Sequence, residues 1–124
     1  MNLSGRVPLG VGIDIEDVAR WRKPNIRWQA LFTEDELAYC RGKGDPALHF
    51  AGFWCLKEAV FKAAGSALDI TLRDIIITHR ADGTPRIELR GQDESLDDRL
   101  LVSVSHSPNS AVAIAIFLDG ESFH

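Results

Sequence analysis

The sequence predicts an α+β domain in which an antiparallel sheet packs against one long helix and a shorter helix. Three observations support this prediction: an alternating apolar pattern near the amino end, a long helical pattern in the middle, and two pairs of apolar runs around turn signals after it. The chain has no internal repeat, low-complexity tract or linker. We therefore expect a single domain over residues 1–124.

The first predicted strand covers residues 11–16. Apolar residues at positions 11, 13 and 15 alternate with Gly12, Asp14 and Glu16. Because successive side chains of a strand point to opposite faces, we expect Asp14 and Glu16 to project together from one face.

A basic, tryptophan-containing segment, residues 20–28, leads into the shorter helix. Thr33 followed by Glu36 is a capping-box pattern, in which two side chains satisfy backbone N–H groups at a helix start. This pattern predicts a helix from here to about Arg41. The residues 42–44 that follow are expected to form a loop.

The long helix is predicted from Asp45 and Pro46, which are typical of an N-cap and a first helical residue. It is expected to run to Ala64, with Gly65 as its stop. Small residues recur at helical spacing and predict a narrow core stripe, formed by Leu48, Ala51, Cys55, Ala59 and Ala63.

The remainder is predicted as β structure. Residues 74–78 and 86–89 flank Asp82-Gly83, a strong hairpin signal. Residues 101–106 and 111–118 flank a second turn at 107–110. The last strand carries alanine at 111, 113 and 115, so one of its faces is small enough to accept either the long helix or a neighbouring subunit closely.

The composition indicates an ordinary globular protein of 124 residues, with 45% hydrophobic and 26% charged residues. A net charge of −4 argues against general nucleic-acid binding, which requires a basic face. Cys40 and Cys55 form neither a disulfide framework nor a metal-ligand spacing, and Cys55 is expected to be a plain buried thiol. No segment suggests a membrane span or a leader, so we expect a cytoplasmic protein without a membrane partner.

Acidic and basic side chains recur at spacings that bring them together. Glu58 and Lys62 lie four residues apart, so they share one edge of the long helix. Asp14, Glu16 and Glu58 offer the oxygen ligands that Mg²⁺ prefers, and a nearby lysine would bind phosphate oxygens. The alternative is a solvated strand end with an ordinary helical salt bridge, and spacing alone does not decide between the two.

A second group of polar residues, Ser103–Ser107, ends a predicted strand at a turn. Its Ser-x-Ser-His pattern suggests nucleophilic catalysis but lacks the Gly-x-Ser-x-Gly setting of a nucleophile elbow. His106 is expected either to hydrogen-bond within the turn or to donate to a phosphate or a base. The other histidines have no partner spacing and are assigned no role: His49, His79 and His124.

A local basic cluster in this acidic chain suits an acidic partner, although such clusters are often plain solvated surface. The cluster consists of Arg20, Arg22, Lys23 and Arg27.

Together these segments resemble the paired signature of the 4′-phosphopantetheinyl transferases. The resemblance lies in Gly12-Ile13-Asp14-Ile15-Glu16, in Phe32-Thr33-Glu34-x-Glu36, and in Trp54-x-x-Lys57-Glu58-Ala59-x-x-Lys62-x-x-Gly65. It spans residues 10–65 and extends through the terminal Ser-x-Ser-His strand to nearly the whole chain. It implies the α+β fold of that family.

That family has two main types. Holo-acyl-carrier-protein synthases are short and assemble as trimers with active sites between subunits, whereas the surfactin-synthetase-activating type is a pseudo-dimer about twice as long. This chain has the length of the first type. Glu16 and the Trp-x-x-Lys-Glu pattern are closer to the second, because the short type usually lacks this acid. The short type also has arginine and phenylalanine before its Lys-Glu, in the stretch where this chain has Phe53 and Trp54. The resemblance therefore implies a homo-oligomer, with a trimer favoured.

The resemblance also implies a reaction, the transfer of the 4′-phosphopantetheine arm of coenzyme A to a serine of an apo acyl or peptidyl carrier protein, with release of adenosine 3′,5′-bisphosphate. Asp14, Glu16 and Glu58 would hold Mg²⁺ against the pyrophosphate. Lys62, with Lys57 as a second contact, would neutralise phosphate charge. Glu58, directly or through a metal-bound water, would also take the serine proton.

The same resemblance implies that Ser105 and His106 bind the nucleotide end of coenzyme A from an adjoining subunit, and that the basic cluster docks the acidic helix of the carrier protein. Two other functions remain open. One is a non-catalytic coenzyme-A-binding or scaffold member of the same fold. The other is an unrelated metal-dependent phosphohydrolase that uses Asp14, Glu16 and Glu58.

Overall fold

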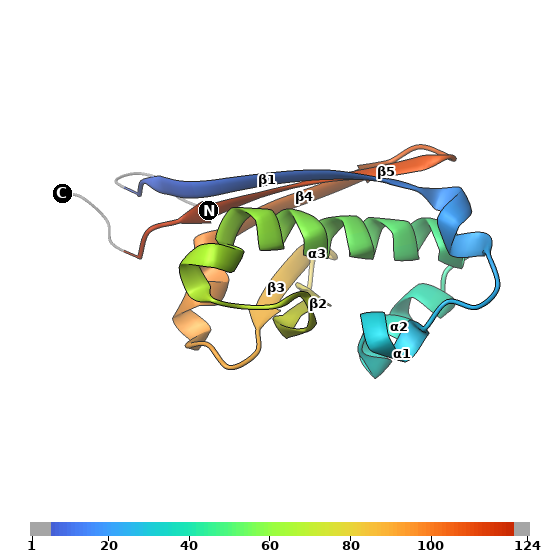
Figure 1. The fold of residues 1–124 in the computed structure, drawn as a ribbon, viewed down its shortest axis with the longest axis horizontal. Coiled ribbons are helices and arrows are strands. Elements are labelled where there is room, and N and C mark those ends of the chain that lie inside the picture. Colours follow the sequence, from blue (N-terminus) through green and yellow to red (C-terminus); the bar gives the residue numbers. More distant parts are fainter. Residues whose placement is uncertain (1–5, 121–124) are drawn as a thin grey trace.

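The computed structural model of the chain describes residues 6–120, so the two ends of the predicted domain 1–124, including His124, lie outside the described residues. Figure 1 shows the larger sheet above the long helix, with the hairpin and the shorter α-helices below that helix. In chain order the elements are β1 (Pro8–Asp17), the 3₁₀ helix η1 (Val18–Arg22), α1 (Trp28–Leu31), α2 (Glu34–Arg41), α3 (Pro46–Leu68), η2 (Leu72–Asp74), β2 (Ile75–His79), β3 (Pro85–Leu89), η3 (Glu94–Arg99), β4 (Leu100–His106) and β5 (Ser110–Leu118).

The strands form two antiparallel sheets. One has the strand order β1-β5-β4, and the other is the hairpin β2-β3. The long helix α3 packs on the larger sheet, while the hairpin and the helices α1 and α2 lie on the opposite side of α3 (Figure 1). The α+β class with one long and one shorter helix is therefore confirmed, with the strands divided between two sheets. None of the helices in residues 6–120 has the length and apolar character needed to cross a bilayer.

Two local predictions are confirmed by the details of the structure. Thr33 caps α2, since its hydroxyl accepts from the Glu36 N–H at 3.1 Å and the Glu36 carboxylate accepts from the Thr33 N–H at 2.8 Å. Gly83 turns the β2-β3 hairpin with a φ of 88°, a left-handed conformation that favours glycine.

The predicted end of the long helix is wrong, because α3 continues past Gly65 to Leu68. Gly65 is buried inside the helix, where an added Cβ would crowd the ring of Phe61. The chain leaves the helix at Asp69, which has a φ of 53° and donates its N–H to the Gly65 carbonyl. The glycine therefore provides space for a ring rather than a helix stop.

The inner face of the large sheet lies directly against α3. The alanine face of β5 is fully buried there. Within one chain, this face is therefore covered by the long helix. On β1, Gly10 and Gly12 approach still more closely. A Cβ on either glycine would overlap a backbone carbonyl of α3, that of Ala63 for Gly10 and that of Ala59 for Gly12.

We expect Gly12→Ala to lower the free energy of unfolding by about 2–3 kcal/mol, because β1 must move away from α3 to admit a methyl group. Urea denaturation measures this loss. Gly44→Ala is the matched control, since a Cβ there meets no atom within 4 Å. A Gly12→Ala protein as stable as the wild type would show that this close approach does not exist.

The outer face of the large sheet is apolar and uncovered. Val11, Ile13 and Ile15 of β1 are 61–70% exposed, and they pair across the sheet with Ile116, Ile114 and Val112 of β5. A contiguous apolar surface of this kind usually marks an interface.

Candidate active site

The acids of β1 project from one face, as the alternation predicted, and the structure turns that face toward the long helix. The carbonyl oxygen of Asp14 accepts a hydrogen bond from the Cys55 thiol of α3 at 3.0 Å, which fixes the strand beside the helix. Cys55 is completely buried, and burial raises the pKa of its thiol to about 12. The prediction of a plain buried thiol is confirmed.

Glu58 and Lys62 project from α3 toward this end of β1. The Lys62 ammonium donates to Asp14 Oδ1 at 3.0 Å and to the Ile13 carbonyl oxygen at 2.9 Å. Glu58 is half-buried, and this burial, more than the nearby Asp14 and Glu16 carboxylates, raises the pKa of its carboxyl group. The ammonium of Lys62 partly opposes that rise. The structure thus brings the predicted acids and Lys62 into one electrostatic group.

Glu16 is bound to an arginine. Its Oε1 lies 2.6 Å from the Arg20 guanidinium, and its side chain is only 10% exposed. The guanidinium lies over the ring of Trp21, with its carbon 5.0 Å from the ring centroid, and 6.0 Å from the centroid of Trp54. The role of Arg20 beside this acid was not foreseen, although its position four residues after Glu16 is a detectable signal.

The predicted metal ligands match Mg²⁺ in chemical type but not in their arrangement in this structure. Within residues 6–120, no three His, Cys, Asp or Glu side chains are gathered closely enough to ligate one ion. The donor chemistry nevertheless suits Mg²⁺, because carboxylate oxygens are the ligands it takes from proteins. Asp14 and Glu16 direct an oxygen at Lys62 and Arg20 respectively. The residues present therefore fit a magnesium ion in type, while two of their carboxylates are bound to basic side chains.

Lys57 does not face the site. Its side chain is 2% exposed, and its ammonium donates to the Glu36 carboxylate at 2.8 Å and to the Ile75 carbonyl oxygen at 2.7 Å. Glu36 in turn accepts from the Ile77 N–H at 2.8 Å, so the pair joins α2, α3 and β2. This corrects the predicted phosphate contact of Lys57, because an ammonium enclosed by these partners does not reach a surface ligand.

Ser105 and His106 lie on the other flank of α3. Ser105 pairs with Val112 on the outer face of the sheet, whereas His106 pairs with Ala111 on the face toward α3. Neighbouring strand residues point to opposite faces, so within one chain these two side chains do not converge. His106 lies 6.0 Å from His49 of α3, measured between ring centroids.

A cavity of about 150 Å³ opens beside His106. Its walls include the stacked rings of Tyr39 and His79, whose centroids are 4.1 Å apart, together with Phe53 and Pro85. Burial lowers the pKa of His49 and of His79. Both were assigned no role from the sequence, and the cavity places them beside the predicted nucleotide contact.

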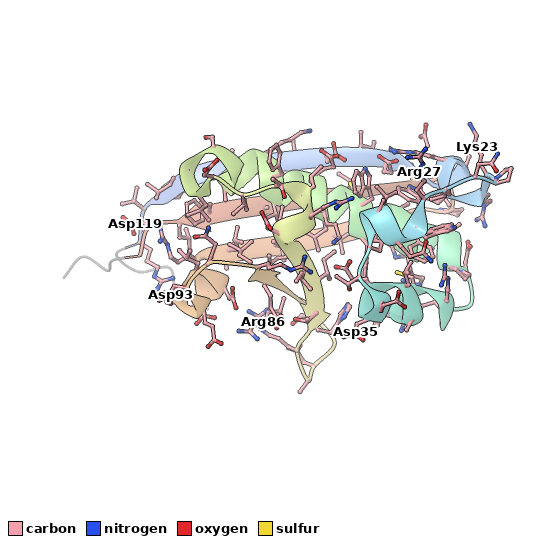
Figure 2. The ribbon with its side chains drawn as sticks, turned by 60° about the horizontal axis from the view of Figure 1, so that its bottom comes forward. Lys23, Arg27, Asp35, Arg86, Asp93 and Asp119 are labelled. Carbon is pink, nitrogen blue, oxygen red and sulfur yellow. The ribbon has the colours of Figure 1, made fainter. Side chains whose placement is uncertain are left out.

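The basic cluster is only partly available to a partner. Arg22 forms two hydrogen bonds with the Asp45 carboxylate, at 2.9 and 2.8 Å, and Arg20 is held by Glu16. Figure 2 shows Lys23 and Arg27 at the end of the molecule formed by η1 and the segment after it. Both are exposed, so the positive charge of the cluster is presented mainly by these two side chains.

Comparisons with known proteins agree on one family. A model described as the 4′-phosphopantetheinyl transferase superfamily matches residues 10–116. The holo-[acyl-carrier-protein] synthase of Thermodesulfovibrio yellowstonii is 32% identical over 86% of this chain and 96% of its own length. That of Geobacter sulfurreducens is 36% identical over 86% of this chain and 94% of its own length.

The fold matches as well. The crystal structure of a holo-(acyl-carrier-protein) synthase from Bacillus anthracis in complex with coenzyme A superimposes with a TM-score of 0.73 at 26% identity. The match covers 90% of this chain and 96% of that one.

Proposed function

Since the chain belongs to the 4′-phosphopantetheinyl transferase superfamily, we propose that it transfers the 4′-phosphopantetheine arm of coenzyme A to a serine of an apo carrier protein and releases adenosine 3′,5′-bisphosphate. One observation carries the proposal beyond the likeness. Glu58 and Lys62 of α3 are placed against Asp14 of β1, so the acids and the base of the family signature share one surface.

Each residue of this surface has its own proposed role in phosphoryl transfer. Asp14 and Glu58, with Glu16 as a third ligand, would hold Mg²⁺, which when bound neutralises charge on the pyrophosphate. Lys62 is half-exposed, so its ammonium can leave Asp14 and bind a phosphate oxygen. Glu58 would accept the proton of the carrier serine, and its raised pKa suits that role.

A complete site is proposed to need two copies of the chain. Asp14, Glu58 and Lys62 lie on the β1 flank of α3, and His106 lies on its β4 flank, with the helix and β5 between them. A nucleotide held at His106 of one copy would therefore meet the acids of another. The apolar outer face of the large sheet gives the copies a surface to join, and a homotrimer is the assembly we propose.

We expect Ile13→Lys to break the assembly, because it places a charge at the centre of the outer sheet face, where Ile13 is 61% exposed in the single chain. Sedimentation velocity should show monomers, and transfer should be lost with the oligomer. Ile13→Val keeps the apolar surface and should sediment like the wild type. A wild-type chain that is monomeric at all concentrations would contradict the proposal.

Lys23 and Arg27 are proposed to dock the acidic surface of the carrier protein. The double change Lys23→Glu and Arg27→Glu should raise the KM for the carrier about tenfold and leave the KM for coenzyme A nearly unchanged, because only encounter with the protein substrate is affected. Arg80→Glu, in the loop between β2 and β3, is the control for added negative charge. An equal rise in both constants would show that these residues do not form a carrier dock.

The function itself is tested by incubating the protein with coenzyme A, Mg²⁺ and an apo carrier, followed by intact mass measurement. Separate assays with acyl and peptidyl carriers decide between the carrier preferences of the short and long family types. A gain of one phosphopantetheine supports the transferase. Coenzyme A binding without gain favours the scaffold alternative, and nucleotide cleavage without carrier favours the phosphohydrolase.

We also propose a cytoplasmic location. The two cysteines, Cys40 and Cys55, are both buried free thiols, which suits a reducing compartment.

A further inference from the structure

Two of the three acids of the candidate site are already engaged by basic side chains of the same chain. Glu16 is bound by Arg20 at 2.6 Å, and Asp14 is bound by Lys62 at 3.0 Å. Glu58 forms no ion pair within the described residues. The charges of this surface are therefore nearly balanced without any bound ion.

The two basic partners differ in how they are held. Lys62 also donates to the Ile13 carbonyl oxygen, and phosphate binding is its proposed role. Arg20 lies in η1, and its side chain extends back to Glu16, four residues earlier in the chain. The guanidinium lies over the rings of Trp21 and Trp54. The two rings attract a guanidinium whether or not a carboxylate is beside it, so they would keep Arg20 at the rim of the site after Glu16 leaves it.

We propose that Arg20 is a reversible counter-ion of the metal site: it is bound to Glu16 until a divalent cation binds that carboxylate. The guanidinium released by the cation then stays on the two tryptophan rings, where it can contact an anionic partner. This inference rests on the proposed function, because it assumes that Glu16 is a magnesium ligand.

A coupling follows from this competition. If binding of the cation frees Arg20, then whatever binds the free guanidinium must in turn strengthen binding of the cation by the same factor. The metal and the acidic carrier surface would thus promote each other's binding through one side chain, and a metal-free enzyme would present less positive charge to the carrier. Arg20 acts here as a positioning residue for the metal site and makes no contact with the reacting atoms.

The test measures Mg²⁺ binding by calorimetry and by tryptophan emission, and neither readout requires turnover. Arg20→Gln removes the competing charge and should tighten Mg²⁺ binding about fivefold, in keeping with the strength of an exposed ion pair. Mg²⁺ should change the tryptophan emission of the wild type, because the guanidinium that stays on Trp21 and Trp54 loses its carboxylate partner, and this change should be at least halved in the variant. Arg22→Gln is the matched control, since that arginine is equally exposed but pairs with Asp45.

A double-mutant cycle makes the test specific to Glu16. In a Glu16→Gln background, Arg20→Gln should no longer alter the Mg²⁺ affinity. Unchanged or weaker Mg²⁺ binding by Arg20→Gln in the otherwise wild-type chain overturns the inference. If the wild type then still modifies the carrier protein, the proposed function stands and only the counter-ion role is lost. A wild type that binds no Mg²⁺ and transfers nothing overturns both.

Discussion

Replacing Glu58 with glutamine should lower the transfer rate at least about 100-fold while leaving the fold intact. The change keeps the volume of the side chain but removes a carboxylate that is proposed both to hold Mg²⁺ and to accept the serine proton, and loss of a general base alone typically costs this much. Intact mass measurement of the carrier over time gives the rate. Thermal unfolding should be little changed, because Glu58 has no ion pair in the described part of the chain.

The matched control is Glu94→Gln in η3, an exposed acid distant in sequence from the site. It removes one negative charge from the same chain without touching the surface between β1 and α3. A Glu58→Gln enzyme that works near the wild-type rate would refute the role assigned to this carboxylate, whatever the control shows.

Replacing Lys57 with methionine should reduce the free energy of unfolding by about 3–5 kcal/mol. The change leaves the Glu36 carboxylate buried without its ammonium partner, and an uncompensated buried charge is among the most costly defects in a protein interior. Urea denaturation followed by circular dichroism measures the loss. An effect below about 1 kcal/mol would show that this pair does not hold α2 and α3 together.

Lys62→Met, on the same helix, should have the opposite effects: little change in stability and a clear loss of activity. Lys62 is half-exposed in its ion pair with Asp14, so its loss should change stability little, since exposed pairs contribute about 0–1 kcal/mol. Its loss should instead slow transfer and weaken coenzyme A binding. The two lysines of the signature would thus be separated into one that holds the fold and one that contacts phosphate.

The sequence was sufficient wherever a local rule decides the outcome. Alternation along β1 placed Asp14 and Glu16 on one face, because the period of a strand is fixed by its backbone. The capping box at Thr33 and the turn at Gly83 were likewise found, since each depends on residues close in the chain.

Predictions that depend on distant partners were less successful. Lys57 comes two residues after Cys55 of the predicted core stripe, and its position in the sequence does not identify the partner of its ammonium. Only the position of α2 shows that this partner is Glu36. Glu36 itself was recognised as a capping residue, while its second role as the buried counter-ion was not. Gly65 matched a helix-stop signal, but it lies inside α3, where the absence of a side chain leaves space for the ring of Phe61. In each case the deciding neighbour lies on another element or on an adjacent turn.

In the proposed assembly, the uncovered isoleucines and valines of the large sheet would make the stability of this protein depend on its concentration. In the proposed assembly only folded chains associate, so mass action links the folding equilibrium to the total amount of protein. The melting temperature should therefore climb as the protein is concentrated. Newly made chains, while still scarce, would be the ones most accessible to proteases and chaperones.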